Sequence, residues 1–326
     1  MPHPSASLNL LVLGGTVFLG RHVVDSALAA GHRVTVFNRG RRSIDWPGPV
    51  RALVGDRDGD TSALRGQAFD AVIDCSGYRP AQITSVAQAL GPALPFWVFV
   101  STISVVARFP PGLPHDEHTP VTTDTQGYGG EKARAEETLL SLCDGRAAVV
   151  RPGLIVGPHD PTGRFGYWPW RIAQGGAVLA PGRPERPVQV IDARDLAAWC
   201  VQLAQTQVAG TFNAVGPSMP MHSVLDACRD ASGSDARFVW RSDAELLAAN
   251  VAPWTGMPLW IPEDDADFGG MLLARHDRAI AAGLRCRPIA DTVADTLAAL
   301  RASPQPVVFA NVISPEREAQ LIGGGP

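Results

Sequence analysis

The sequence predicts an α/β fold in which a doubly wound, Rossmann-type parallel sheet is joined to a smaller C-terminal lobe. An apolar run over 8–13 ends in two glycines and continues as a helix-forming segment, which is the pattern of a buried strand, a tight turn and a helix. Strand-like and helix-like segments then alternate through the first half of the chain, as in βαβ units. With 326 residues, 45% of them hydrophobic, the chain is long enough for two closely joined lobes.

The stretch 8–20, LNLLVLGGTVFLG, is the segment around which the first lobe is organised. The first N–H groups of a helix have no internal partners and lie at the positive end of its dipole, so a glycine turn before a helix forms a phosphate site. The spacing Gly14-x-x-Val17-x-x-Gly20 lacks the middle glycine of the usual dinucleotide fingerprint. On this stretch alone, a chance glycine turn after a buried strand is the alternative.

The remaining elements follow from apolar runs and their boundaries. Helices are expected over 18–30, 128–142 and 193–204, and strands over 33–37, 50–54, 69–74, 96–101, 147–150 and 188–191. The carboxyl ends of parallel strands meet at one edge of a sheet, where ligands bind. That edge should carry Gly14, Asn38, Asp56, the segment 75–77, Ser101 and Thr102.

We expect the first lobe to cover 1–155, with 186–215 returning to it. The second, substrate-binding lobe should comprise 156–185 and 216–302, followed by a C-terminal tail over 303–326 with one short helix opening at Ser314-Pro315. The segment 107–125, rich in Pro, Thr and Asp, is expected to be a loop, and so is most of the chain from Arg151 to Pro187.

Composition favours a small-molecule substrate. The net charge is −4 and the basic residues are dispersed, so we expect neither nucleic acid nor a membrane surface as a partner. A homodimer is compatible with this composition. Residues 1–7 carry no basic segment before a short apolar run, which predicts a cytoplasmic protein. The five cysteines are scattered without a C-x-x-C pair, which predicts reduced thiols and no zinc site.

The segment HDEH, from His115 to His118, places two imidazoles and two carboxylates close together. It lies between prolines, with no helix to hold both histidines on one face. We therefore expect a solvated loop there and no metal site.

Tyr128 and Lys132 form the most informative pair. Lys132 is the sole lysine among 28 basic residues and Tyr128 is one of three tyrosines; their i, i+4 spacing places both on one face of a helix. A neighbouring ammonium would pull a phenol pKa down from about 10, so that the phenol could donate a proton to a carbonyl, and could also hold a cofactor ribose. A hydroxyl must hold the substrate oxygen, and we choose Thr102, with Ser101 and Ser104 as alternatives at the same strand end.

With these residues in view, the chain resembles the extended and atypical short-chain dehydrogenase/reductase superfamily, near its NAD-dependent epimerase/dehydratase-like and isoflavone-reductase-like members. The resembling stretches are GGTVFLG (14–20), FNRG (37–40), GDRDG (55–59), FVSTISV (99–105), YGGEK (128–132), VVRPGLIVGPHD (149–160) and VIDARDLA (190–197). The resemblance implies an NAD(P)-dependent oxidoreductase with Thr102, Tyr128 and Lys132 as its catalytic set.

The resemblance also implies a cofactor site. In it, Gly14, Gly15 and Gly20 hold the pyrophosphate, Asp56 approaches the adenine, and Pro152 and Gly153 flank the nicotinamide. The full set of candidate cofactor-binding residues is Gly14, Gly15, Thr16, Phe18, Leu19, Gly20, Asn38, Arg39, Asp56, Arg57, Cys75, Ser76, Gly77, Ser101, Lys132, Pro152 and Gly153. Val17 and Val106 depart from the pattern of the superfamily.

The end of the second expected strand favours NADP(H) over NAD(H). An acidic residue there would bind the ribose of NAD, whereas this chain has Asn38 and Arg39, with Arg41 and Arg42 close by to pair with a 2′-phosphate. A solvated basic loop is the alternative interpretation.

Candidate substrate-binding residues are Tyr78, Ser104, Arg164, Trp168 and Trp170. Six of the eight tryptophans fall after residue 160, which favours a compact apolar or aromatic substrate over a nucleotide sugar. We expect Trp168 and Trp170 in a pocket or lid, with Arg171 available for an anionic substituent. The alternative is that these rings form the core of the second lobe.

Three functions remain open. We favour an NADP(H)-dependent reductase or dehydrogenase of a small carbonyl or imine compound, with Tyr128 as general acid/base. The second is a nucleotide-sugar epimerase or dehydratase that recycles its cofactor internally. Against it, Val188 stands where such enzymes usually carry a diphosphate-binding arginine, although Arg186 is two residues away. The third is an NADP-binding regulator without catalysis.

Overall fold

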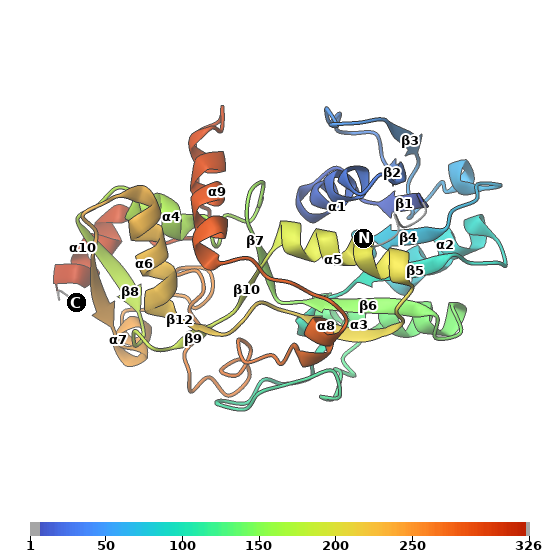
Figure 1. Ribbon diagram of the computed structural model, residues 1–326. Helices are drawn as coiled ribbons and strands as arrows, with labels where there is room; N and C mark the ends of the chain where they lie inside the picture. Colours follow the sequence, from blue (N-terminus) through green and yellow to red (C-terminus); the bar gives the residue numbers. More distant parts are fainter. Residues whose placement is uncertain (1–6, 324–326) are drawn as a thin grey trace.

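The central element of the fold is a seven-stranded sheet (Figure 1). The computed structural model describes residues 7–323, and within them the sheet has the strand order β3-β2-β1-β4-β5-β6-β11, with every neighbouring pair parallel. Its strands are β1 (Asn9–Leu13), β2 (Arg33–Asn38), β3 (Val50–Val54), β4 (Ala71–Asp74), β5 (Phe96–Val100), β6 (Ala147–Pro152) and β11 (Gly210–Ala214). The order reverses beside β1, which confirms the predicted doubly wound α/β fold.

Helices cover both faces of the sheet. They are α1 (Phe18–Ala29), α2 (Pro80–Leu90), α3 (Gly127–Leu142) and α5 (Ala193–Thr206). Side chains alternate along β1, so Leu10 and Val12 pack with α1 and α5, while Leu11 and Leu13 pack with α2 and α3. Burial on both faces explains why the strands read as continuous apolar runs in the sequence.

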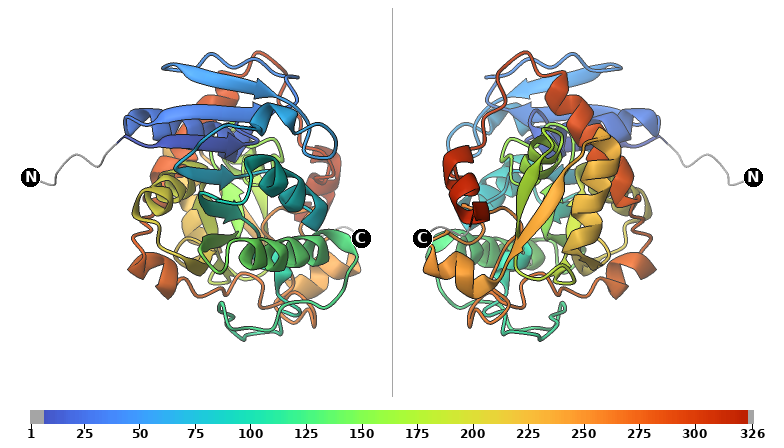
Figure 2. Two further views of the ribbon diagram at one scale, coloured as in Figure 1. Left: turned by 90° about the vertical axis from the view of Figure 1, so that its right-hand side faces the viewer. Right: turned by 90° about the vertical axis from the view of Figure 1, so that its left-hand side faces the viewer.

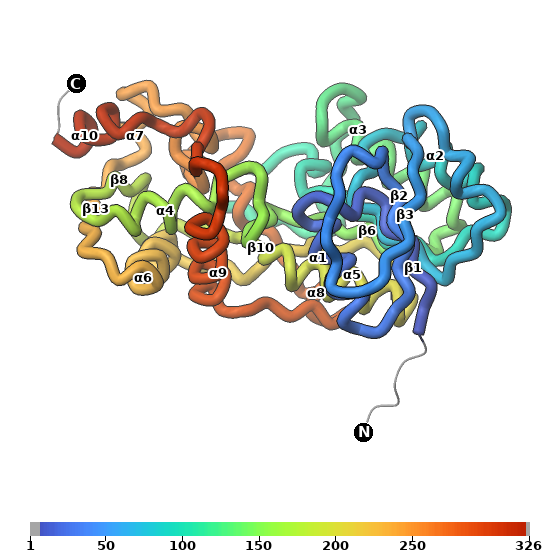
Figure 3. Tube along the Cα trace, turned by 90° about the horizontal axis from the view of Figure 1, so that it is seen from above, coloured from blue at the N-terminus to red at the C-terminus, as the bar shows by residue number. Residues whose placement is uncertain are grey.

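A second lobe lies beside this sheet, as the view from above also shows (Figure 3). Its elements are α4 (Tyr167–Ile172), β8 (Ala177–Pro181), α6 (Met221–Ser232), β13 (Arg237–Arg241), α7 (Asp243–Ala248), α9 (Ile289–Arg301) and α10 (Pro315–Gly323). Strands β8 and β13 pair in parallel, and helices pack against them around a core that contains the fully buried Trp168 and Trp260 (Figure 2, right). The short helix expected at Ser314-Pro315 is present as α10.

Two small strand pairs connect the lobes: β7 (Leu154–Val156) with β10 (Val190–Asp192), and β9 (Pro187–Val188) with β12 (Met219–Pro220). The chain then returns to the first lobe through α5 and β11. A later return to the first lobe was not expected: α8 (Asp277–Ala281) packs near β11, and Ala279 and Leu284 belong to the core of the first lobe. The expected second lobe, 216–302, therefore includes a segment that packs on the first.

Of the two segments expected to be loops, 107–125 is irregular as expected, whereas the chain from Arg151 to Pro187 is not. From Arg151 to Pro187 the structure contains β7, α4 and β8, which are too short to give a clear periodicity. In 107–125 there is no regular helix or strand, but His115 is buried: its ring lies 4.9 Å from that of Phe109 and its Nε2 lies 3.2 Å from the Met271 carbonyl oxygen. The expectation of a solvated loop is therefore wrong for His115.

No group of three or more His, Cys, Asp or Glu side chains within residues 7–323 is arranged to hold a metal ion, and the five cysteines are unpaired. In the same part of the chain, no helix is long and apolar enough to cross a membrane. Residues 1–6, on which the expectation of a cytoplasmic protein partly rests, lie outside the described residues.

Candidate active site

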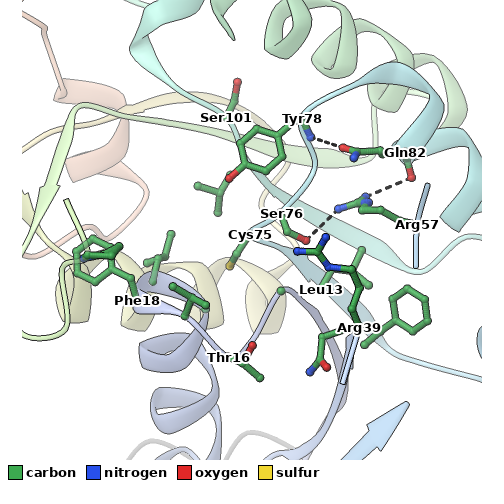
Figure 4. Close-up of a pocket in the computed structure, with 18 of the residues that line it drawn as sticks. Leu13, Thr16, Phe18, Arg39, Arg57, Cys75, Ser76, Tyr78, Gln82 and Ser101 are labelled. Atoms are coloured by element: carbon green, nitrogen blue, oxygen red, sulfur yellow. Dashed lines mark hydrogen bonds between the residues drawn. The ribbon is translucent and has the colours of Figure 1, made fainter. Parts of the chain in front are cut away.

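A cavity of about 780 Å³ opens at the carboxyl ends of the strands, between α1, the loop after β2 and the N-terminal half of α3 (Figure 4). The candidate cofactor residues that line it are Gly14, Thr16, Phe18, Leu19, Gly20, Asn38, Arg39, Asp56, Arg57, Cys75, Ser76, Ser101, Lys132, Pro152 and Gly153. Thr102, Tyr128 and Tyr78 line the same cavity. Residues from distant parts of the sequence thus meet where the strand order reverses.

The glycine turn at the start of α1 is built for close backbone approach. Gly14 has φ +83°, and a Cβ there would come within 2.6 Å of the Ser76 Cβ; a Cβ on Gly20 would overlap the Gly14 carbonyl. Val17 precedes the helix, and no side chain caps its first N–H groups. Phe18, Leu19 and Gly20, the first residues of α1, line the cavity at the positive end of the helix dipole.

Two predicted cofactor residues, Gly15 and Gly77, are not in the cavity lining. A Cβ on Gly15 would meet Val36 at 2.9 Å, and one on Gly77 would meet Phe99 at 2.7 Å. Both glycines therefore allow close packing of neighbouring elements. The carbonyl of Gly77 has a further role, because it accepts a hydrogen bond from Lys132.

The loop after β2 presents cationic side chains to the cavity. Arg39, Arg41 and Arg42 are exposed, line the cavity and form no ion pair with any residue in 7–323. Figure 4 shows the Arg39 side chain pointing into the cavity. The Asn38 side chain accepts a hydrogen bond from the Gly40 N–H at 2.8 Å, which fixes the turn that carries Arg39.

The floor of the cavity contains a buried ion pair. Arg57 Nη1 and Nη2 donate to the two carboxylate oxygens of Asp74 at 2.7 and 2.8 Å, and Nη1 also donates to Ser76 Oγ at 3.2 Å. Burial raises the pKa of Asp74, but the Arg57 guanidinium opposes it and holds the pKa below its usual value. Arg57 is therefore committed mainly to Asp74, and only its Nε lacks a partner.

Sequence reasoning missed Gln82, which also lines the cavity. Its side chain accepts from the Tyr78 N–H and donates to Asp58, both at 2.8 Å. The signal was present, because Gln82 stands at the third position of α2, two residues after Pro80, where a Gln side chain commonly reaches back to the start of the helix.

Paired glycines bring α3 close to the end of β5. A Cβ on Gly129 would overlap the Ser104 carbonyl, and one on Gly130 would overlap the Asp124 carbonyl. This close approach places Tyr128 beside Thr102, whose hydroxyl acts to lower the pKa of the Tyr128 phenol. Thr102 also caps the short helix η2 (Ile103–Val105), since its Oγ1 accepts from the Ser104 N–H at 3.1 Å.

Lys132 is 3% exposed and is enclosed by backbone carbonyls and rings. Its Nζ donates to Gly77 O at 2.7 Å and to Val100 O at 2.6 Å, and lies 5.0 Å from the Tyr78 ring and 4.7 Å from the Phe99 ring. Burial lowers its pKa to about 8. The enclosure suits a compact ammonium better than a guanidinium, which accounts for a lysine in an arginine-rich chain.

The expected lowering of the Tyr128 pKa is not found. Burial raises that pKa above 10, and the Thr102 hydrogen bond and the charge of Arg164 only partly oppose the rise. The reason is the position of Lys132, whose ammonium donates to the carbonyls of Gly77 and Val100 rather than to the phenol.

Only some of the candidate substrate residues line the cavity. Tyr78 lines the cavity, with its ring 6.2 Å from that of Tyr128, while Ser104, Arg164 and Trp170 do not line it. Arg164 is exposed, and its guanidinium carbon lies 5.7 Å from the centre of the Trp254 ring.

A pocket or lid role is wrong for Trp168. Its side chain is fully buried in the core of the second lobe, where the indole N–H donates to Pro258 O at 3.0 Å. Arg171 is also unavailable to a substrate, because it pairs with Glu318 at 2.7 Å and donates to two backbone carbonyls. Composition alone could not distinguish core tryptophans from lid tryptophans.

Residues 10–215, which include the whole cavity lining, match the family model described as NAD dependent epimerase/dehydratase family. The chain belongs to this family. The resemblance to the extended short-chain dehydrogenase/reductase superfamily is thereby confirmed. A nicotinamide dinucleotide is the cofactor typical of this epimerase/dehydratase family, and the glycine turn and uncapped α1 are suited to its pyrophosphate.

Solved structures share the fold of this family member. UDP-glucose 4-epimerase from Bifidobacterium longum, in complex with NAD⁺ and UDP, is 18% identical, with a TM-score of 0.66 over 91% of this chain and 99% of that chain. The Bordetella bronchiseptica enzyme WbmH, in complex with NAD⁺, is 17% identical, with the same TM-score and coverage. At these identities the similarity establishes the fold alone.

One curated relative is the chloroplast stem-loop binding protein of 41 kDa b from Arabidopsis thaliana. It is 26% identical over 250 residues, which are 70% of this chain and 64% of the relative. The chain thus spans less than two thirds of that relative's length.

Proposed function

We propose that this epimerase/dehydratase family member is an NADP(H)-dependent oxidoreductase that transfers hydride to or from a small carbonyl or imine compound. The observation that carries the proposal is the convergence of Thr102, Tyr128 and Lys132 at one end of a cavity whose other parts suit a dinucleotide. A binding protein without catalysis would not need a phenol and a hydroxyl beside each other at that place.

The residues present fit the cofactor. Gly14 and Gly20 let the turn pack tightly before α1, so that the N-terminus of this helix lines the cavity where a pyrophosphate would bind, and Ser101 Oγ is buried in the cavity wall without a hydrogen-bond partner. An unpaired buried hydroxyl costs free energy, which a polar ligand would recover. When bound, the nicotinamide supplies or accepts the hydride.

The side chains of Thr102, Tyr128 and Lys132 would bind the substrate and the cofactor ribose and transfer the proton. The hydroxyls of Thr102 and Tyr128 hold the substrate oxygen, and Tyr128 donates or accepts its proton. The ammonium of Lys132 has three N–H groups, of which two bind the carbonyls of Gly77 and Val100. One donor is left for a ribose hydroxyl on the cavity side.

The second lobe favours this proposal over a nucleotide-sugar epimerase. Arg186 is 2% exposed, donates to the Ile261 carbonyl and lies 3.7 Å from Asp243, while Arg183 pairs with Glu263 at 2.8 Å. Arg183 is thus committed to a protein partner, Arg186 is buried beside Asp243, and neither arginine lines the cavity, so both are poorly placed to bind a diphosphate there. The net charge of −4 likewise favours a small substrate over the stem-loop named for the Arabidopsis relative.

The function is tested by screening a panel of aldehydes, ketones and imines for oxidation of NADPH. We expect saturable turnover with at least one compact aromatic member. If instead the purified protein retained NAD(P) tightly and interconverted uridine or thymidine diphosphate sugars without added cofactor, the epimerase function would take first place.

Arg39→Asp is expected to reverse the cofactor preference. A charge-assisted pair with a 2′-phosphate contributes roughly 1.5–3 kcal/mol, so the Kd for NADPH should rise by about tenfold to a hundredfold while that for NADH changes little. Fluorescence titration of both nucleotides measures this. The matched control is Arg33→Asp at the opposite end of β2, which is exposed and does not line the cavity. A variant with unchanged preference would contradict the NADP(H) assignment.

Arg164 is expected to select substrates that carry an acidic group. It is exposed beside Trp254, forms no ion pair within 7–323, and its charge lowers the pKa of Tyr128. Arg164→Gln should lower kcat/KM for 4-formylbenzoate by about tenfold and leave kcat/KM for its methyl ester unchanged. Arg164→Lys keeps the positive charge and should retain much of the wild-type preference for the acid over the ester. Equal losses on acid and ester would show that Arg164 does not read the substrate charge.

A further inference from the structure

Tyr78 occupies a position that neither the family match nor the proposed function explains. It lies in the loop between β4 and α2, and its side chain reaches into the cavity (Figure 4). Its ring lies 5.0 Å from Lys132 Nζ and 6.2 Å from the Tyr128 ring, at an angle of 52°. Tyr78 is therefore in contact with two of the three residues of the expected catalytic set.

The backbone around Tyr78 is held on both sides. The Gly77 carbonyl accepts from Lys132 at 2.7 Å, and the Tyr78 N–H donates to Gln82 Oε1 at 2.8 Å. Gln82 is in turn held by Asp58, to which its amide donates at 2.8 Å. The ring thus stands on a fixed segment of chain, although the side chain itself is 48% exposed.

Exposure differs sharply across this contact. Lys132 is 3% exposed, while the Tyr78 ring that covers it is 48% exposed. On the protein side, the ammonium is covered by the Phe99 ring at 4.7 Å and by the carbonyls of Gly77 and Val100. The Tyr78 ring is therefore one of the groups that shield the ammonium from solvent, while Lys132 itself still belongs to the cavity lining.

We propose that Tyr78 is a positioning residue of this site: its ring closes the ammonium of Lys132 off from water and supports the ring of Tyr128 at the cavity mouth. The shielding of Lys132 is a property of the folded chain by itself. The consequence of this shielding for turnover rests on the proposed function.

Other groups also shift the pKa of Lys132, and their effects must be distinguished from that of the Tyr78 ring. Burial lowers its pKa most; Asp74 and Cys75 at the end of β4 and Glu136 on α3 raise it, and Arg57 lowers it. None of these groups belongs to the Tyr78 side chain, so a substitution at Tyr78 leaves them in place. Two opposite effects of the ring remain: shielding from water disfavours the charged amine, and cation–π attraction favours it.

The sole lysine makes a direct measurement feasible. With selectively ¹⁵N-labelled lysine, the full-length protein gives one Nζ signal, whose titration should report a pKa of about 8. In Tyr78→Leu, water reaches the ammonium and the pKa should rise by roughly one unit. Tyr78→Phe keeps the ring and should leave it unchanged. Phe268→Leu, a similarly exposed aromatic position outside this cavity, is the matched control.

Each outcome decides the proposal. A pKa that is unchanged or lower in Tyr78→Leu overturns it, because the ring would then be dispensable or act only by cation–π attraction. Tyr78→Met serves as a second ring-free variant if Tyr78→Leu fails to unfold cooperatively on heating. A raised pKa combined with no turnover of any carbonyl would retain the role of Tyr78 in enclosing Lys132 and contradict the proposed function instead.

Discussion

Tyr128→Phe is expected to reduce kcat for carbonyl reduction by about 10²- to 10⁴-fold, the range in which a positioned proton donor contributes. The phenylalanine keeps the ring that packs near Tyr78 and removes only the hydroxyl beside Thr102. Because the hydroxyl acts mainly in the transition state, the Kd for NADPH should change by less than about twofold. Steady-state NADPH oxidation and fluorescence titration measure the two quantities.

A suitable control is Tyr167→Phe, which removes the hydroxyl of a tyrosine in the core of the second lobe. This control should keep its activity, so a loss confined to Tyr128→Phe would identify the phenol and not a general effect of losing a tyrosine hydroxyl. Full activity in Tyr128→Phe would mean that the substrate proton comes from another group.

The sheet could be predicted because its determinants are local. Runs such as 10–13 and 96–100 are apolar throughout, as expected for strands buried on both faces, and Gly14 and Gly20 mark the turn into α1. The order of the strands then follows from the rules for βαβ units. The packing of 277–286 against the first lobe could not be foreseen, because it depends on contacts between distant segments.

In the candidate site too, local features could be predicted from the sequence and contacts between distant segments could not. The spacing of Tyr128 and Lys132 correctly placed both at the cavity, but it did not show that Lys132 would be enclosed by Gly77, Val100 and the Tyr78 ring. Spacing along one helix fixes which face two residues share. The pKa of each depends on neighbours from other strands, and this is why the phenol pKa rises where a fall was expected.

The enclosure of Lys132 also predicts a pH dependence. Burial lowers the Lys132 pKa to about 8, so the amine is charged below that pH and becomes neutral as the pH rises through it. The pKa of Tyr128 is raised from its usual value of about 10, so the phenol still carries its proton at the pH where the Lys132 ammonium begins to titrate. If the ammonium binds the cofactor ribose, kcat/KM for NADPH should fall about tenfold per pH unit above 8, reaching roughly a hundredfold loss at pH 10.

This ratio is the appropriate measure because it reports the free enzyme, to which the pKa of about 8 applies. Lys132→Met should have low activity at every pH and no alkaline limb near 8, since the titrating group is gone. Thermal unfolding at each pH separates loss of activity from loss of fold. A limb that stays near 8 in Lys132→Met would belong to another group, whereas a wild-type profile that remains flat to pH 10 would show that turnover does not need the charge on Lys132.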